Sequence, residues 1–280
     1  MSILKIEGLT KHFDTFTLEN VSFEVEEGTV MGFIGRNGAG KTTTLKSLLG
    51  LVHADSGNIE FMGKPLRENE EWAKQNIGVV FGGADYYPAN KLGTIAKVTS
   101  KFYDNWDEEL FNKYLRKFSL NPQKRIKELS AGMKVKFSLA LALSHGAKLL
   151  LLDEPTSGLD PVSRDEIIGI FMHLISDGEH SILFSTHIIS DLEKCADYIT
   201  YIKEGRILHS TDKESFADKY RKVTLSQVTD KIKPALIGKR KNSFGFEAMI
   251  KAEDEYLFAD TDAQISRIGL EDIMIYLERE

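Results

Sequence analysis

Cysteine is nearly absent from this sequence, since Cys195 is the only one among 280 residues. A single cysteine excludes an internal disulfide framework, as expected of a protein from a reducing compartment. Cys195 lies in the helix-like stretch DLEKCADYI, where its simplest role is that of a small buried hydrophobic side chain. The cysteine count therefore points away from secreted, disulfide-stabilised scaffolds.

Long apolar runs are also missing. FSLALALS and KLLLL come closest to one, and His145, Gly146 and Lys148 interrupt them, whereas a membrane-spanning helix needs about 18 to 20 apolar residues in succession. The N-terminal MSILKIEGLTK lacks a basic start followed by a long apolar run, so we expect no signal peptide. The sequence is therefore expected not to span a membrane itself.

A surplus of basic residues is the third absence. Lysine and arginine number 36 against 42 acidic residues, which gives a formal net charge of -6 and a pI near 5.7. Broad attraction to the phosphates of nucleic acid is therefore not expected. The one basic cluster, KRK at residues 239–241, fits a solvated turn more simply than a phosphate contact. No nucleic-acid partner is predicted.

What the sequence does contain is a set of continuous apolar runs. The clearest are TVMGFI at 29–34, KLLLLD at 148–153 and SILFST at 181–186. Continuous rather than alternating hydrophobicity is typical of strands buried on both faces of a parallel sheet. Each run leads into a helix-like segment, which predicts an α/β domain with a central, mostly parallel sheet. The length suits one large domain, or one of about 200 residues with an appendage.

Between Gly93 and Leu143 the pattern becomes helical. Asn105 is predicted to cap a helix with Glu108 at its third position, a capping-box arrangement. A stripe of apolar side chains recurs every four residues, and this spacing favours a helix core over a ligand-binding box. The stripe consists of Phe102, Trp106, Leu110, Tyr114 and Phe118, with Phe111 and Leu115 beside it. After about Asp212 the apolar runs shorten, which predicts a small appended α/β unit.

The run GRNGAGKT at residues 35–42 follows the first buried strand and fits the phosphate-loop pattern G-x-x-x-x-G-K-[ST]. Glycines let successive backbone N–H groups turn inward on a triphosphate, and the positive end of the following helix favours the same anion. Lys41 is expected to reach the β- and γ-phosphates, and the Thr42 hydroxyl to ligate Mg²⁺. The predicted nucleotide-binding residues are Gly35, Arg36, Asn37, Gly38, Ala39, Gly40, Lys41, Thr42 and Thr43.

A phosphate-loop enzyme needs acidic side chains at a second strand end, and LLLLDEP supplies them. Asp153 at the tip of this buried strand is predicted to hold Mg²⁺ through water. Glu154 is predicted to polarise the attacking water, and general-base assistance of this kind typically contributes about 10²–10⁴-fold in rate. The sequence thus predicts hydrolysis of ATP or GTP.

Three further motifs complete an ordered set: LSAGM at 129–133, SGLD at 157–160 and His187 in STHIISD. In their order and intervals, the motifs between Leu4 and Leu208 resemble those of the ATP-binding subunits of ABC transporters. The LSAGM run is similar to the signature motif, SGLD to the D-loop, and His187 to the switch histidine.

The resemblance implies a P-loop NTPase core with an ABC-type antiparallel β subdomain and a helical subdomain. The nucleotide-binding domain is expected to span residues 1–212, with the helical subdomain at about 93–143. Residues 213–280 are expected to form a small accessory C-terminal α/β domain.

The resemblance also implies roles for individual side chains. Ser130 and a helix N-terminus would face the γ-phosphate of ATP held by a second subunit, and His187 would bond the γ-phosphate and position the water. Phe13 would stack on adenine. From the residues alone, simpler structural roles stay open, with Ser130 and Asp160 as helix caps and Phe13 as a core side chain.

The sequence departs from the family pattern at two places. In the signature, Ala131 and Met133 replace a glycine and a glutamine, while Ser130 and Gly132 remain. At IGVVFGG, Gly82 stands where the family has the glutamine that touches Mg²⁺ and links the site to the membrane subunit. The second departure bears on coupling to the partner more than on nucleotide binding.

The function implied is that of an ATPase motor. Two nucleotide-binding subunits, as a homo- or heterodimer, would close head-to-tail on two Mg-ATP and drive a separate integral membrane subunit. The protein would then be cytoplasmic, peripheral on the inner face of the cell membrane. Three segments resemble the antibiotic- and peptide-export subgroup, including phenol-soluble modulin and bacitracin-type exporters: the FYDNWDEELFNKYL region, the LSAGM signature and the GLEDIMIYLE ending. An alternative is an ATP-gated regulatory binding protein with slow or no hydrolysis, which Gly82 favours and Glu154 and His187 oppose.

Overall fold

The chain forms two compact units, Met1–Ser210 and Thr211–Glu280. The computed structural model describes residues 1–81, 87–176, 178–242 and 245–279. Gly82, where the family pattern has a glutamine, lies outside the described residues. The sequence predicts its domain boundary at residue 212, which is the last residue of strand β10 (Arg206–Asp212).

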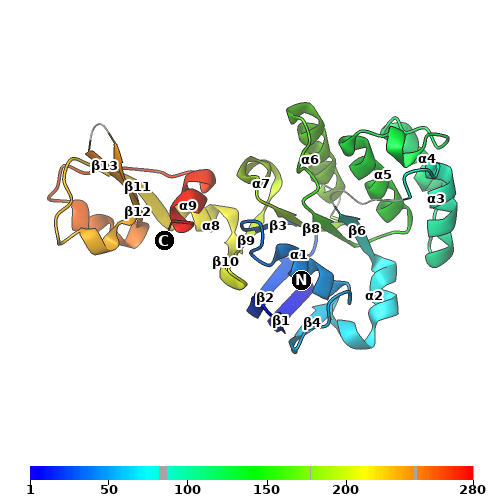
Figure 1. Ribbon diagram of the computed structural model, residues 1–280, viewed down its shortest axis with the longest axis horizontal. Helices are drawn as coiled ribbons and strands as arrows, with labels where there is room; N and C mark the ends of the chain where they lie inside the picture. Colours follow the sequence, from blue (N-terminus) through cyan, green and yellow to red (C-terminus); the bar gives the residue numbers. More distant parts are fainter. Residues whose placement is uncertain (82–86, 177, 243–244, 280) are drawn as a thin grey trace. The chain divides into compact units, whose positions relative to one another are not determined.

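The first unit is built on a central sheet with the strand order β10-β9-β3-β8-β7-β6 (Figure 1). Besides β10 its strands are β3 (Val30–Ile34), β6 (Ile77–Phe81), β7 (Leu149–Asp153), β8 (Ser181–Thr186) and β9 (Tyr198–Lys203). The strands from β9 to β6 are parallel, and β3, β7 and β8 are buried at every position. The α/β fold with a parallel sheet, predicted from these three apolar runs, is therefore confirmed.

The register of this sheet brings the ends of four strands, β3, β6, β7 and β8, to one edge. Ile34 pairs with Thr186, Asp153 with Ser185 and Phe81 with Asp153. Because the carboxyl ends of parallel strands meet at the same edge, the loop after β3 and the acidic end of β7 become neighbours.

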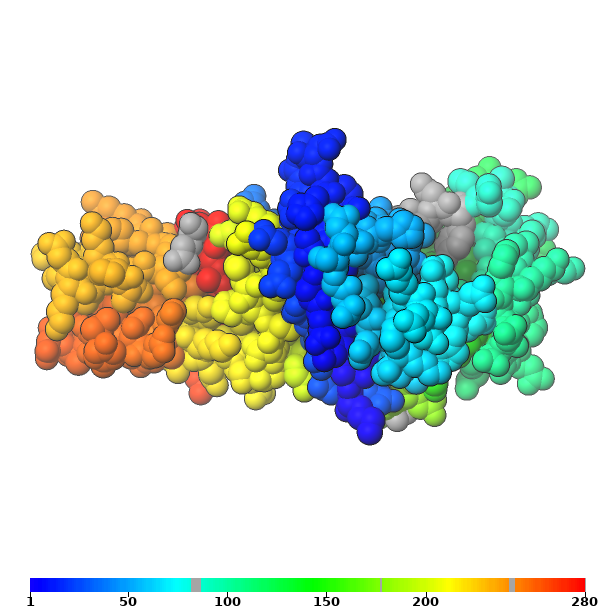
Figure 2. All heavy atoms as spheres, turned by 90° about the horizontal axis from the view of Figure 1, so that it is seen from below, coloured from blue at the N-terminus to red at the C-terminus, as the bar shows by residue number. Residues whose placement is uncertain are grey.

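A second, antiparallel sheet in the first unit has the order β2-β1-β4-β5. Its strands are β1 (Ser2–His12), β2 (Thr17–Glu26), β4 (Ser56–Phe61) and β5 (Lys64–Pro65). Figure 2 looks onto this part, where the dark-blue N-terminal strands lie beside the light-blue segment that contains β4. One hydrophobic cluster joins this sheet to the central sheet and includes Ile6, Phe33, Leu45, Leu48 and Leu151. Two of these, Leu45 and Leu48, anchor the helix that follows the phosphate loop.

The described helices of the first unit all lie between strands in the order of the chain. They are α1 (Lys41–Leu48), α2 (Glu70–Asn76), α3 (Leu92–Thr99), α4 (Glu108–Lys117), α5 (Ala131–Ser144), α6 (Pro161–Ile175) and α7 (Ile189–Cys195), with short 3₁₀ turns η1 (Leu66–Glu68), η2 (Ser100–Phe102) and η3 (Ile126–Glu128). Helices α3, α4 and α5 gather at one end of this unit (Figure 1), in the segment where the sequence predicts a helical subdomain.

The helical segment differs from the sequence prediction in its cap and its core. The capping prediction for Asn105 is wrong: Asp107 directly precedes α4, and its carboxylate accepts the Leu110 N–H at 2.8 Å. The four-residue stripe is also wrong at its start, because Phe102 precedes the helix and is 70% exposed. The side chains that α4 and the turn after it bury are those of Phe111, Leu115 and Phe118.

The second unit is an antiparallel sheet with the order β12-β13-β11-β14 and accompanying helices. Its elements are α8 (Lys213–Asp218), β11 (Tyr220–Leu225), η4 (Lys233–Ala235), β12 (Ile237–Asn242), β13 (Gly245–Lys251), η5 (Ala252–Phe258), β14 (Gln264–Ser266) and α9 (Leu270–Leu277). A separate small core contains Val223, Ala248, Ile250 and Phe258. In the parts of the chain described, no helix combines the length and the apolar character needed to cross a membrane.

Candidate functional site

Loop 35–40 connects the end of β3 to the start of α1. Gly38 and Gly40 have φ angles of 84° and 114°, in a region that side chains disfavour. Gly40 is the N-cap of α1, and no side chain caps the first N–H groups of this helix. These donors and the positive helix end suit an anion such as a phosphate. The loop is tied to the sheet because the Gly205 N–H donates to the Ala39 carbonyl at 3.0 Å.

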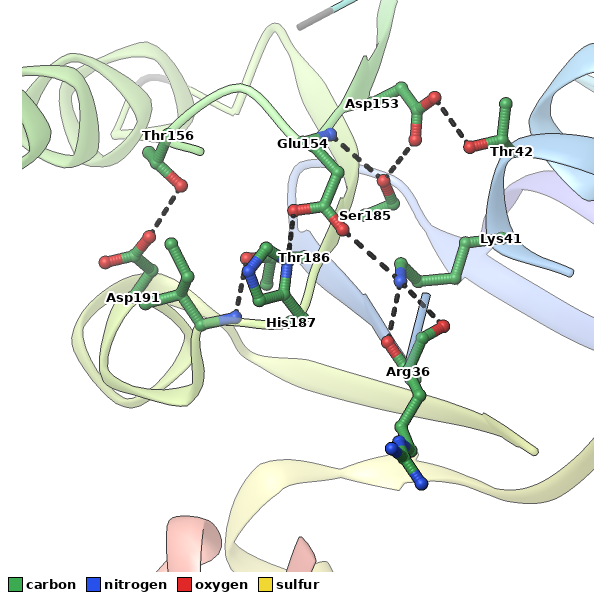
Figure 3. A network of polar contacts seen from close by, with 12 residues as sticks. Arg36, Lys41, Thr42, Asp153, Glu154, Thr156, Ser185, Thr186, His187 and Asp191 are labelled. Carbon is green, nitrogen blue, oxygen red and sulfur yellow. Dashed lines mark hydrogen bonds and ion pairs between the residues drawn. The ribbon is translucent and has the colours of Figure 1, made fainter. Parts of the chain in front are cut away.

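Lys41 is a buried cation at the centre of this loop. Its Nζ donates to the carbonyl oxygens of Gly35 at 2.6 Å and Arg36 at 3.2 Å. The same Nζ forms an ion pair with Glu154 Oε1 at 3.3 Å (Figure 3). All three ammonium donors therefore have an acceptor nearby, and the side chain is only 5% exposed.

Asp153, the last residue of β7, is held through both carboxylate oxygens. Thr42 Oγ1 donates to Oδ2 at 2.9 Å, and Ser185 Oγ donates to Oδ1 at 2.5 Å. Ser185 is fully buried and also accepts the Glu154 N–H at 3.1 Å. The hydroxyl predicted to ligate a metal thus lies directly beside the carboxylate predicted to do the same.

Glu154 lies between Lys41 of the phosphate loop and His187. Its Oε2 is 2.8 Å from His187 Nδ1, while its buried Oε1 faces Lys41 and makes no hydrogen bond among the described residues. The Glu154 backbone has a φ of 50°, a left-handed conformation that costs a non-glycine residue about 1–3 kcal/mol. The surrounding structure therefore holds this side chain in place.

The contact to Glu154 fixes what His187 can do next. A neutral imidazole has one N–H, and with Nδ1–H donated to Glu154 its Nε2 can only accept a hydrogen bond. A γ-phosphate contact of the kind the resemblance implies needs a donor at that position. While Nδ1–H is donated to Glu154, a neutral His187 therefore has no donor left for a phosphate at Nε2.

Phe13 lies at the edge of the same site. Its ring is 45% exposed, which contradicts the alternative of a core side chain, and its centroid is 6.4 Å from that of Phe16. Phe16 borders the phosphate loop, because a Cβ built on Gly40 would lie 3.1 Å from Phe16 Cζ. An exposed aromatic face near the phosphate loop is suited to stacking on a base.

We expect Phe13→Ala to weaken ATP binding by about fivefold or more, because stacking of a base on an aromatic ring contributes about 1–3 kcal/mol. Binding of tripolyphosphate, which has no base, should be unchanged, as should the melting temperature. Titrations of both ligands measure this, with Phe102→Ala as the exposed-phenylalanine control. An equal loss for both ligands would show that Phe13 acts on the phosphates or the fold instead.

The signature residues lie on a different helix from the residues described so far. Ser130 caps α5 and accepts the Met133 N–H at 3.2 Å. A Cβ on Gly132 would approach Ser163 Cβ of α6 to 3.2 Å, so this glycine allows α5 and α6 to pack closely. These contacts of Ser130 and Gly132 are with α5 and α6 and not with loop 35–40. Asp160 likewise caps α6, where Ser163 and the backbone hold the pKa of its carboxyl below the usual value.

Sequence reasoning missed three polar side chains of this region. The run SILFST predicts a strand and gives Ser185 no separate role, although a serine one residue before the end of an apolar run is a usable signal. Thr156 and Asp191 were also missed, and the Thr156 hydroxyl donates to Asp191 Oδ2 at 2.6 Å in the interior. All three contact partners far along the chain, so their roles depend on the strand order and register.

Comparisons with known proteins identify the family of the chain. The profile of the family described as ABC transporter matches residues 18–157. The bacitracin transport ATP-binding protein BcrA of Bacillus licheniformis is 30% identical, and the match covers 84% of this chain and 78% of BcrA. The lantibiotic transport ATP-binding protein SrtF of Streptococcus pyogenes is 36% identical, with coverage of 74% and 89%.

Solved structures give the same result. An ATP-binding subunit of an ABC transporter superposes with a TM-score of 0.69 at 26% identity, covering 76% of this chain and 91% of that one. CbiO1 of Clostridium perfringens, part of the ABC transporter complex cbiONQ, gives 0.67 at 28% identity, with coverage of 78% and 92%. The chain therefore belongs to the ABC transporter family, as an ATP-binding subunit that hydrolyses ATP to drive transport.

Proposed function

We propose that this subunit powers an exporter of antimicrobial or amphipathic peptides. Two of its relatives are named as transport proteins for bacitracin and for a lantibiotic, and both match most of the chain. ATP-binding subunits of transporters work with membrane components, so the peptide would be selected by that membrane subunit. The alternative of an ATP-gated regulator is not favoured, because the relatives are transport subunits and Glu154 and His187 are both present.

The position of the Glu154 carboxylate carries the proposal for the chemistry. One oxygen faces the phosphate-loop lysine at 3.3 Å, and the other is bonded to His187. The oxygen that faces Lys41 has that ammonium as its ion-pair partner and makes no hydrogen bond in the described structure. When a nucleotide phosphate takes over the ammonium, this oxygen would be available to accept a proton from a water molecule. We assign Glu154 as the general base and His187 as the residue that orients it.

The oxygen atoms of Thr42 and Asp153 fit Mg²⁺, which prefers hard oxygen ligands. No group of three or more acidic, histidine or cysteine side chains that could hold a metal occurs within the described ranges. We propose that the ion binds together with the nucleotide, since Mg²⁺ in such sites is held by one or two protein ligands plus substrate phosphates. When bound, it neutralises charge on the phosphates.

The nucleotide itself is proposed to lie along loop 35–40 and Thr43, with its base on Phe13. Ser130 and Gly132 are proposed to contact the γ-phosphate held by a second subunit, because the positive N-terminus of α5 suits that anion. The head-to-tail dimer that this requires is proposed to lie in the cytoplasm, at the inner face of the cell membrane, through its membrane partner.

Purification of the full chain from native membranes, with the proteins bound to it, tests the proposal. We expect an integral membrane subunit to co-purify, and bacitracin or an amphipathic helical peptide to raise the ATPase rate of the reconstituted complex severalfold. A proline-substituted peptide that cannot form a helix serves as the control for amphipathic structure. A complex without a membrane subunit, or one indifferent to all peptides, would contradict the exporter assignment.

A further inference from the structure

A buried carboxyl group lies next to the catalytic pair but outside the nucleotide loop. Asp191 is in the first turn of α7 and only 1% exposed, and burial raises the pKa of its carboxyl above the usual value. Its partner is the Thr156 hydroxyl at 2.6 Å, and Thr156 is fully buried as well. Burying a carboxyl group and a hydroxyl costs free energy unless the two are hydrogen-bonded. The place of this pair in the fold therefore points to what the pair does.

Thr156 and Asp191 lie shortly after the two proposed catalytic residues, Glu154 and His187, in the chain. Thr156 lies two residues after Glu154, and Asp191 lies four residues after His187. The hydrogen bond between them therefore joins the segment that leaves Glu154 to the helix that follows His187, as Figure 3 shows. A second bond joins the same two segments before His187. Ser185 lies two residues before His187, and its hydroxyl accepts the Glu154 N–H.

The hydrogen bond between Glu154 and His187 is exposed, in contrast to the bond between Thr156 and Asp191. The His187 side chain is 44% exposed, and a single bond of 2.8 Å joins it to Glu154. Exposed hydrogen bonds compete with water, whereas buried ones do not. The alignment of the two catalytic groups therefore depends on the buried bonds before and after them.

The start of the helix after His187 links His187 to Asp191. The Ile188 N–H donates to Thr186 Oγ1 at 2.9 Å, and the Asp191 N–H donates to the Ile188 carbonyl at 3.3 Å. His187 is thus carried on a short turn whose far end is attached to Thr156. A displacement of Asp191 moves this turn and changes the distance between His187 Nδ1 and Glu154 Oε2.

We propose that Thr156 and Asp191 form a positioning pair, whose buried hydrogen bond holds His187 against Glu154 for hydrolysis. The inference rests on the roles proposed above for Glu154 and His187. If the pair only stabilised the fold, its removal would lower the melting temperature but would leave the turnover rate of the folded protein unchanged. The two possibilities are therefore separable by measuring rate, affinity and stability together.

The test is Thr156→Val in the full chain, which keeps the shape of the side chain and removes the hydroxyl. We expect kcat for ATP to fall about tenfold while the ATP dissociation constant changes less than about twofold, because the loss is confined to the hydrolytic step. Thr156→Ser restores the hydroxyl and should keep kcat within about twofold of the wild type.

Thr200→Val is the matched control. Thr200 is also a fully buried threonine, and its hydroxyl bonds Ser210 at 2.9 Å in the central sheet. We expect this variant to lose stability and to retain kcat. Wild-type kcat in Thr156→Val, or a Thr156→Ser variant as slow as Thr156→Val, would overturn the positioning role.

A second measurement does not depend on hydrolysis. The seven histidines can be labelled with ¹⁵N in the ring, and the His187 signals identified with His187→Gln. In Thr156→Val the Nδ1 signal of His187 should shift, since its bond to Glu154 loosens, and it should stay unchanged in Thr200→Val. An unshifted signal would overturn the inference, whereas a wild type without ATPase activity would count against the proposed chemistry alone.

Discussion

Replacing Glu154 with glutamine is expected to abolish steady-state ATP hydrolysis while ATP binding is retained. Glutamine keeps the size of the side chain and an acceptor oxygen for His187, but its amide cannot take a proton from water. Loss of a general base costs about 10²–10⁴-fold in rate. Phosphate release and ATP binding, measured on the same preparation, test the prediction.

The contact with Lys41 gives a reason why binding should survive this substitution. Glu154 Oε1 pairs with the Lys41 ammonium at 3.3 Å, so under the proposed binding mode the carboxylate would compete with the phosphates for the same cation. Neutral glutamine removes that competition, and we expect ATP affinity to be equal to or higher than that of the wild type. Glu166→Gln, which breaks an exposed ion pair with Lys136, controls for the loss of one acidic charge. A rate within about tenfold of the wild type would show that another group serves as the base.

The parts of the fold that depend on local pattern were predictable from the sequence. The three continuous apolar runs became the fully buried strands β3, β7 and β8, because hydrophobicity on both faces of a strand is a local property. The phosphate loop was predictable for the same reason, since its glycines and Lys41 are adjacent in the chain.

Contacts between distant residues were not predictable. Ser185 reaches Asp153 because β7 and β8 are neighbours in a register that places these two residues opposite each other. A shift of one residue would have turned the Ser185 side chain to the other face of the sheet. Nothing in the order of motifs specifies that register, and the bond between Thr156 and Asp191 depends on it in the same way.

The helix cap shows a local error of a different kind. Asn105 followed by Glu108 matches a capping pattern, but Asp107 stands directly before the first helical residue and bonds the Leu110 N–H. The Asp107 N–H in turn donates to the Ser144 carbonyl at the end of α5, at 2.7 Å. Packing against α5 thus contributes to where α4 begins, and a sequence pattern does not contain that contact.

Replacing Lys41 with alanine is expected to reduce ATP affinity by about 10- to 150-fold, the range that follows from a lost charged hydrogen bond of about 1.5–3 kcal/mol. Two effects add to this loss. The Gly35 and Arg36 carbonyls lose their buried donor, and the Glu154 carboxylate loses its counter-ion and repels the incoming phosphates. Lys46→Ala is the control, since Lys46 is an exposed lysine on the same helix.

The expected repulsion between the Glu154 carboxylate and the phosphates makes the effects of Lys41→Ala and Glu154→Gln on ATP affinity interdependent. Because Lys41 and Glu154 are in contact, their effects on affinity should not add, as expected for residues within one ion pair. We expect the double variant, Lys41→Ala with Glu154→Gln, to bind ATP more tightly than Lys41→Ala alone, since the uncompensated carboxylate is gone. It should bind more weakly than Glu154→Gln alone, because the lysine is also proposed to contact the phosphates directly. Titrations of ATP against the wild type and the three variants measure the coupling. Strict additivity would show that the ion pair between Lys41 and Glu154 has no influence on nucleotide binding.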